Sequence, residues 1–281
     1  MTAITLTIAP QPPVHPFDLS VALTPAGPDH YRGATHPAYA NMVGPFGGTT
    51  AAVMLQAALV HPQRLGEPIV QTVNYAAPIQ DGAFEVQARP VRTNRSTQHW
   101  QLALTQDGQV MAIGSAVFAL RRPTFAACEA TAPVDMPPPE ALPRFEAAGR
   151  PPWVRAYDMR FRPGPQPMHF DGGELAHSLT EGWVRDEPPR PLDHASLTAL
   201  CDSFFPRIMI RRRRPVPIGT VSLSTCFHAD AAALAALGTQ HVLGVARALN
   251  FRGGYFDQRA EVWSRDGALL ASSQQMVYFK E

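Results

Sequence analysis

The chain has 281 residues, of which 45% are hydrophobic and 17% are charged, with a formal net charge of +1 at pH 7. This hydrophobic fraction is sufficient for a core, and the near-zero charge argues against nucleic acid or a membrane as a partner. Three cysteines without a CxxC pair argue against a disulfide scaffold. Met1–Pro16 lacks a secretory signal, and no window is apolar enough to span a membrane, so we expect a cytoplasmic protein.

The first half predicts one enclosed helix between extended segments. Phe17–Thr24 and His30–Thr35 are candidate strands. Gly47–Val60 then predicts a helix that is apolar nearly all round, since only Gln56 is polar after Thr50. A helix without a polar face must be wrapped by the rest of the domain. Four alternating segments follow and predict an antiparallel meander: Ile69–Ala77, Ala83–Asn94, Thr97–Gln106 and Val110–Leu120.

A proline-rich segment, Arg121–Pro152, predicts a mostly extended linker without regular structure. We therefore divide the chain into three parts. An N-terminal unit with its arm spans residues 1–122, the linker spans 123–152, and a C-terminal unit spans 153–281.

The second half repeats the order of the first. Asp193 is a plausible N-cap for a helix over His194–Phe205. Asp107-Gly108 and Asp266-Gly267 are matching hairpin turns between the last two strands of each half. Such an internal duplication predicts an α+β chain built from two helix-plus-sheet units. The candidate strands are Trp153–Phe161, His177–Val184, Thr220–Phe227, Val242–Asn250, Tyr255–Ser264 and Leu269–Phe279.

Six short motifs, three in each half of the chain, are specific when their order and spacing are taken together. They are Phe46-Gly-Gly, Tyr75-Ala-Ala-Pro, Asn94-Arg-Ser, Leu200-Cys-Asp-Ser-Phe-Phe-Pro, Gly219-Thr-Val-Ser-Leu-Ser-Thr-Cys-Phe-His and Ala271-Ser-Ser-Gln-Gln. Through them, residues 40–120 and 153–280 resemble the acyl-CoA thioesterase II (TesB-like) family. The resemblance implies the double hotdog fold, in which each of two tandem units has a long helix wrapped by a curved antiparallel sheet.

The resemblance also implies a site and a reaction. Enzymes of this family hydrolyse acyl-CoA with an Asp, a Thr and a Gln that position a water molecule. When the motifs are matched, these roles fall on Asp202, Thr220 and Gln275. Gln274 is an alternative for the Gln role, because a shift of one residue in the strand register would turn Gln274 and not Gln275 toward the site. The family further implies acyl-CoA as the partner, no cofactor, and a homodimer or higher homo-oligomer.

The residues themselves leave alternatives open at each position. Asp202 interrupts an apolar helix, so burial should raise its pKa, but it could instead be a cap or an ion-pair partner. Free N–H groups near Gly47 and Gly48 suit a thioester oxyanion, whereas the glycines could equally serve close packing. Arg211–Arg214 could contact the phosphates of CoA, but a solvated loop is the simpler interpretation.

Other function classes are less well supported. The histidines show no metal-ligand spacing, so we predict no metal, and the chain lacks GxSxG and GxGxxG motifs. An enoyl-CoA hydratase of the same fold would pair its Asp with a His a few residues later, and Asp202–Ile208 contains none. A non-catalytic acyl-binding protein is the third possibility, because a fold does not certify an activity.

Overall fold

In a computed structural model, residues 14–281 are described, and the first part of the proline-containing arm lies outside them. The helices are α1 (Pro16–Ser20), α2 (Gly47–Leu59), α3 (His194–Leu200), α4 (Arg207–Arg212) and α5 (Ala231–Ala236), with short 3-10 turns η1 (Pro37–Tyr39), η2 (Pro139–Ala141) and η3 (Pro152–Ala156). The strands of the first half are β1 (Thr24–Gly27), β2 (His30–Ala34), β3 (Glu67–Tyr75), β4 (Ala83–Thr93), β5 (Thr97–Gln106) and β6 (Gln109–Ala119). Those of the second half are β7 (Tyr157–Phe161), β8 (Thr180–Asp186), β9 (Ile218–Phe227), β10 (Val242–Arg247), β11 (Phe251–Arg252), β12 (Tyr255–Trp263) and β13 (Leu269–Phe279).

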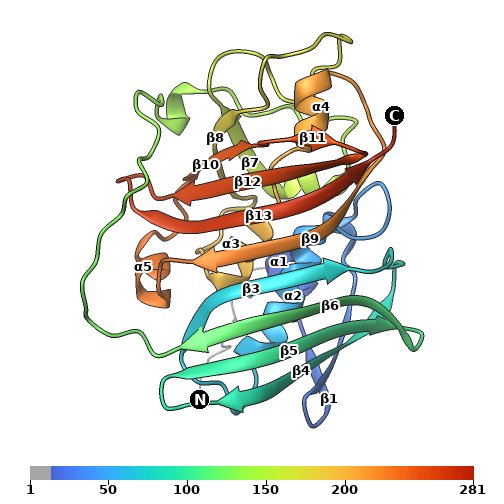
Figure 1. The fold of residues 1–281 in the computed structure, drawn as a ribbon, viewed down its shortest axis with the longest axis vertical. Helices are drawn as coiled ribbons and strands as arrows, with labels where there is room; N and C mark the ends of the chain where they lie inside the picture. The colour runs from blue at the N-terminus through green and yellow to red at the C-terminus, as the bar shows by residue number, and fades with distance from the viewer. Residues whose placement is uncertain (1–13) are drawn as a thin grey trace, which may run out of the picture.

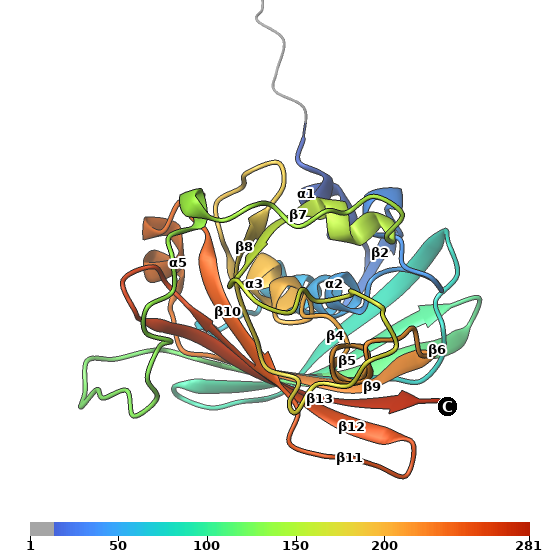
Figure 2. The same cartoon turned by 90° about the horizontal axis from the view of Figure 1, so that it is seen from above.

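Within residues 14–281, thirteen strands form one antiparallel sheet (Figure 1). Their order is β1-β2-β4-β5-β6-β3-β9-β13-β12-β10-β8-β7, and β11 pairs with β12. The sheet is curved, and α2 and α3 lie side by side on its concave side (Figure 2). One face of the sheet and the two helices thus enclose the core.

The strand order is the same in both halves when it is followed outward from the centre. It reads β3, β6, β5, β4, β2, β1 in one direction and β9, β13, β12, β10, β8, β7 in the other. The pair β3–β9 joins the halves through the register Val73↔Leu223. Each half also sends one helix, α2 or α3, across its own part of the sheet, as the duplicated sequence pattern indicated.

Several predicted elements were wrong in type or extent. The predicted strand Trp153–Phe161 begins only at Tyr157, because the residues before it form the 3-10 turn η3 that starts at Pro152. Phe17–Thr24 does not form a strand, because Pro16 begins the short helix α1 and the strand β1 starts only at Thr24. The predicted helix His194–Phe205 ends at Leu200, and a second helix, α4, starts at Arg207. The end of α3 tightens into a turn, in which the amides of Asp202 and Ser203 donate to the carbonyl oxygens of Ala199 and Leu200, and Pro206 then stands at the N-cap of α4.

The helix α2 is buried over most of its length, and the close approach of α3 requires glycine. A Cβ on Gly48 would lie 2.5 Å from the carbonyl oxygen of Ala199. Beside this contact, the ring of Phe46 stacks on Trp153 at 4.4 Å between centroids. The first residues of α2 are therefore held between α3 and an aromatic cluster that comes from the second half of the chain.

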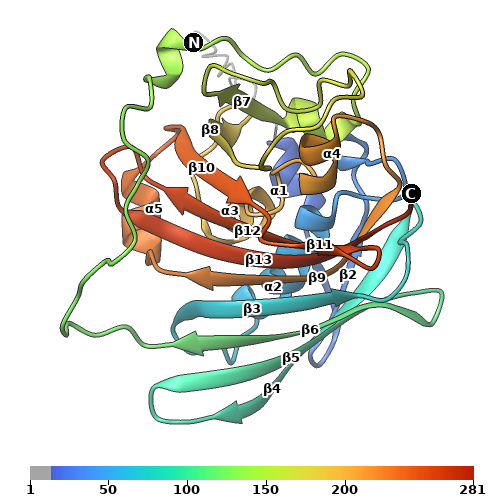
Figure 3. The same ribbon diagram turned by 45° about the horizontal axis from the view of Figure 1, so that its top comes forward.

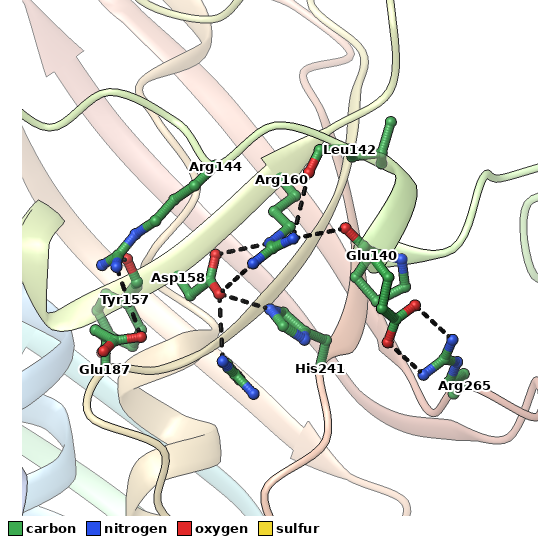
Figure 4. A network of polar contacts seen from close by, with 11 residues as sticks. Glu140, Leu142, Arg144, Tyr157, Asp158, Arg160, Glu187, His241 and Arg265 are labelled. Atoms are coloured by element: carbon green, nitrogen blue, oxygen red, sulfur yellow. Dashed lines mark hydrogen bonds and ion pairs between the residues drawn. The ribbon is translucent and has the colours of Figure 1, made fainter.

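The linker predicted over residues 123–152 contains little regular structure beyond η2 and runs from the end of β6 along the edge of the molecule (Figure 3). A polar network fastens it to the second half (Figure 4). Asp158, which is buried, binds Arg160 through two hydrogen bonds of 3.0 Å, and Arg160 donates to the carbonyl oxygen of Pro139 at 2.8 Å. Glu140 in turn pairs with Arg265 at 2.8 Å.

The Asp158 carboxylate gives this network a pH dependence. Burial opposes ionisation of Asp158, but the hydrogen bond from Arg160 and the charge of His241 hold its pKa below the ordinary value. Its stabilising contribution is therefore present above pH 4 and is lost as the pH falls through the depressed pKa.

We expect Asp158→Asn to destabilise the protein at pH 7 by about 1–3 kcal/mol, because Arg160 and Arg185 lose the negative charge and one of the two acceptor oxygens of their buried partner. Thermal unfolding of both proteins at pH 7 and near pH 3 measures the effect. The difference should shrink at the lower pH, and an equal difference at both values would show that the charge of Asp158 is not responsible.

Candidate active site

The Asp202 carboxyl lies where the end of α3 meets the start of α2. The helix α3 finishes at Leu200, and the amide of Asp202 caps it through the carbonyl oxygen of Ala199 at 3.1 Å. A Cβ on Gly47 would lie 2.9 Å from Asp202 Oδ2, so the side chain faces the first turn of α2. The missing side chain at Gly47 is what leaves room for the carboxyl group.

Two donors hold this carboxyl group. Gln275 Nε2 donates to Asp202 Oδ1 at 2.7 Å, and the backbone amide of Gly48 favours the ionised form of the same carboxyl. Burial nevertheless raises the pKa of Asp202 to about 7, although the hydrogen bonds from Gln275 and Gly48 act in the opposite direction. The group therefore changes its charge near neutral pH instead of being permanently ionised.

The strand register decides between the two neighbouring glutamines. Gln275 in β13 is 3% exposed and faces Asp202, while Gln274 is exposed on the other side of the sheet. Gln275 lies opposite Leu223 in β9 and opposite Gln258 in β12, both of which are also buried. The side chain of Gln275 is thus fixed on the inner face.

A β-bulge turns Thr220 toward the same side. In β9, Ser222 lies opposite Met276 but Thr220 lies opposite Val277, so one residue, Val221, is extra in this strand. Val277 is buried, and residues opposite one another in an antiparallel pair share a face. Without the bulge, strict alternation would place Thr220 on the outer face with Ser222.

A cavity of about 370 Å³ lies at the start of α2, and its lining contains Thr220 but neither Asp202 nor Gln275 and no charged side chain. Gly47 and Thr220 line it together with Tyr75, whose hydroxyl donates to the Gly47 carbonyl oxygen at 2.8 Å. Burial, and secondly the charge of Asp202, raise the pKa of Tyr75, so it remains a neutral donor. The other lining residues are Asn41, Met42, Val43, Pro45, Thr50, Ala76, Ala77, Pro78, Ile79, Ile218, Gly219 and Tyr278.

The structure thus brings Asp202 into contact with Gln275 and with Gly47 at the start of α2. It places Thr220 on the cavity that Gly47 also lines. Tyr75 was missed as a site residue, although it stands in the Tyr-Ala-Ala-Pro motif at the end of β3. The arginines at 211–214 do not reach this cavity. Each of them pairs with an acidic residue (Arg211 with Glu174, Arg212 and Arg214 with Glu281, Arg213 with Asp171).

A larger cavity, about 640 Å³, lies between α1, the β1–β2 hairpin and the end of α2. Polar side chains of its lining bind one another: Arg190 pairs with Asp18 at 2.8 Å, and His61 Nε2 contacts Asp29 Oδ1 at 2.9 Å. Neither Gly47, which lies against the Asp202 carboxyl, nor Thr220 lines it, whereas both line the smaller cavity. The smaller cavity therefore remains the candidate active site.

Comparison with protein families adds a decisive observation. Residues 36–119 match the family model of the acyl-CoA thioesterase N-terminal domain, and residues 130–279 match that of the C-terminal domain. The chain belongs to the acyl-CoA thioesterase family. Both matches include residues of the candidate site, with Gly47 and Tyr75 in the first and Asp202, Thr220 and Gln275 in the second. A comparison with curated proteins found no match.

Solved structures agree on the hot dog fold. A conserved protein of unknown function with this fold from Alicyclobacillus acidocaldarius is 49% identical, with a TM-score of 0.90 over 95% of this chain and 99% of that one. An acyl-CoA thioesterase II, TesB2, from Mycobacterium marinum is 17% identical, with a TM-score of 0.72 over 94% and 98% of the two chains. The dehydratase domain of RzxB from Pseudomonas fluorescens is 11% identical, with a TM-score of 0.53 over 90% and 94%. Within residues 14–281, no helix is long and apolar enough to cross a membrane.

The raised pKa of Asp202 predicts an unusual dependence of stability on pH. Between the ordinary value of 3.8 and about 7, the folded protein holds a proton on Asp202 that the unfolded chain releases. Stability therefore falls as the pH rises through this window. Asp202→Asn removes the buried charge, so its melting temperature relative to the wild type should increase from pH 4 to pH 8. Asp158→Asn is the control, because the pKa of Asp158 lies below its ordinary value of 3.8 and the difference for this variant should stay constant from pH 4 to pH 8. A constant difference for Asp202→Asn would contradict the shift.

Proposed function

We propose that the protein is an acyl-CoA thioesterase that hydrolyses the thioester to a free acid and CoA with a water molecule positioned by Asp202. The observation that carries this proposal is the contact of Asp202 with Gln275 and the Gly48 amide beside an uncharged cavity. A base whose pKa lies near the working pH is both available and effective in proton transfer. Family membership supports the thioester as the substrate.

The architecture that we propose is the double hotdog. One unit comprises residues 1–122 and contains α2, the other comprises 153–281 and contains α3, and residues 123–152 link them. The repeated strand order and the central β3–β9 pair support this division. In this arrangement the site lies between the units, since α2 contributes the glycines and the second half contributes Asp202, Thr220 and Gln275.

In the proposed mechanism, the Asp202 carboxylate removes a proton from water, and the water oxygen attacks the thioester carbonyl carbon. Gln275 orients the carboxylate through its 2.7 Å hydrogen bond. The Thr220 hydroxyl, which lines the cavity, holds the attacking water against the substrate. Collapse of the tetrahedral intermediate breaks the C–S bond, and the departing CoA thiolate takes the proton from Asp202.

The oxyanion of the intermediate needs fixed donors, and the start of α2 supplies one. Because Gly47, and not Gly48, lines the cavity, we assign the oxyanion to the amide of Gly47 at the first position of α2. The hydroxyl of Tyr75 holds the next peptide, Gly47–Gly48, by donating to the Gly47 carbonyl oxygen at 2.8 Å, and so limits movement of Gly47.

We expect Asp202→Asn to lower kcat by roughly 100- to 10,000-fold, the usual contribution of a general base. Gln275→Ala should lower kcat as well, because Asp202 loses its orienting donor. Gln274→Ala is the matched control, since the same side chain is removed one position away on the exposed face. A thiol-release assay over a series of acyl-CoA chain lengths measures all three.

Equal rates for Asp202→Asn and the wild type, or no CoA release at any chain length, would contradict the proposed hydrolysis. Addition of water to crotonyl-CoA without thiol release would instead identify a hydratase. Binding of acyl-CoA without either reaction would identify an acyl-binding protein.

We also propose that the protein is a homodimer or a higher homo-oligomer. The two outermost strands, β1 and β7, each pair on one side only within residues 14–281, and an unpaired strand edge can recruit another chain. Light scattering at micromolar concentration should give at least twice the mass of 30.6 kDa. A particle of monomeric mass would refute this assembly.

A further inference from the structure

The candidate active site opens toward the outer face of the sheet. The strands β3 and β9 pair only from Val70↔Cys226 to Asn74↔Ser222 and then separate. The cavity occupies this gap, because it is lined by the end of β3 and the start of β9. Tyr278 in β13 also lines it, with its ring over Gly219, where a Cβ would lie 2.4 Å from the ring. Since Tyr278 neighbours the buried Val277, its side chain stands on the outer face.

A row of side chains leads away from this opening across the outer face. Tyr278 lies opposite Tyr255 in β12, and Tyr255 lies opposite Arg252 in β11. Directly opposite residues share a face at about 5 Å between Cβ atoms, so the three side chains are consecutive neighbours. Tyr278 and Tyr255 are 39% and 51% exposed. The hairpin β11–β12 and the end of β13 lie beside the C-terminus in Figure 1.

Two cationic side chains lie at this row, one within it and one beside it. Arg252 ends the row, and Lys280 follows Tyr278 by two positions in extended chain, where its backbone N–H donates to Pro217 O at 3.0 Å. Both side chains are exposed, and neither forms an ion pair with a described residue. The acidic residues nearest to them in the sequence already have other partners. Glu281 forms ion pairs with Arg212 and Arg214, and Asp257 Oδ1 accepts hydrogen bonds from the backbone N–H groups of Leu249 and Asn250.

We propose that Tyr278, Tyr255, Arg252 and Lys280, here called the tyrosine platform, bind the nucleotide end of coenzyme A. The proposal rests on the thioesterase function given above. The uncharged cavity suits the uncharged arm of the substrate that ends in the thioester, so the phosphates and the adenine must lie outside it. Exposed tyrosine rings stack with a base, and unpaired cations bind phosphate. The platform supplies both next to the opening.

Two substrates with the same acyl group test this assignment. Acyl-CoA carries the nucleotide, and the corresponding acyl-N-acetylcysteamine thioester lacks it. We expect Tyr255→Ser and the double variant Arg252→Gln/Lys280→Gln each to raise KM for acyl-CoA by about three- to ten-fold. They should leave kcat, and both constants for the short thioester, unchanged. The control is Arg259→Gln, an exposed arginine further along β12.

An equal loss with both substrates, or the same loss in Arg259→Gln, would overturn the platform. Direct titration with CoA separates this proposal from the hydrolysis itself. Weaker CoA binding in the platform variants supports the platform even if Asp202→Asn proves to have no effect on turnover. Unchanged CoA affinity in both variants would refute the platform and leave the thioesterase proposal intact.

Discussion

The contact between a carboxyl group and the first turn of a buried helix is the constraint on which the proposed site depends. Asp202 can reach α2 only because Gly47 and Gly48 have no side chains, and because α3 stops at Leu200. Removal from water favours the neutral acid, while the Gly48 amide and Gln275 favour the carboxylate. The balance places the pKa near 7, which is the range in which one group can both accept and return a proton.

The duplicated fold explains why such a site needs both halves of the chain. Each helix is enclosed by its own part of the sheet, and the halves meet at β3 and β9 and where α2 approaches α3. The two helix ends are therefore positioned by the same packing that forms the core. The separation of β3 from β9 beyond Asn74 and Ser222 leaves the cavity, so the opening also follows from the way in which the halves join.

Periodicity in the sequence was enough to predict α2, the strands of both meanders and the duplication, because these elements bury one regular face. It failed at α1, where Phe17 and Val21 fit a helical repeat as well as an alternating one. The face of the sheet on which the Thr220 side chain lies could not be predicted from the alternation of inward and outward residues, since it depends on the bulge at Val221. The choice of Gln275 over Gln274 required the register of β13, and the row Tyr278–Tyr255–Arg252 required pairing between strands that are separate in sequence.

The dependence of kcat/KM on pH tests the central role of Asp202 most directly. If its carboxylate is the base, kcat/KM for acyl-CoA hydrolysis should rise as this group ionises, with a midpoint at about pH 7. The residual activity of Asp202→Asn should then show no transition there. A wild-type profile that is flat between pH 5 and 8, or a transition that persists unchanged in Asp202→Asn, would contradict the account.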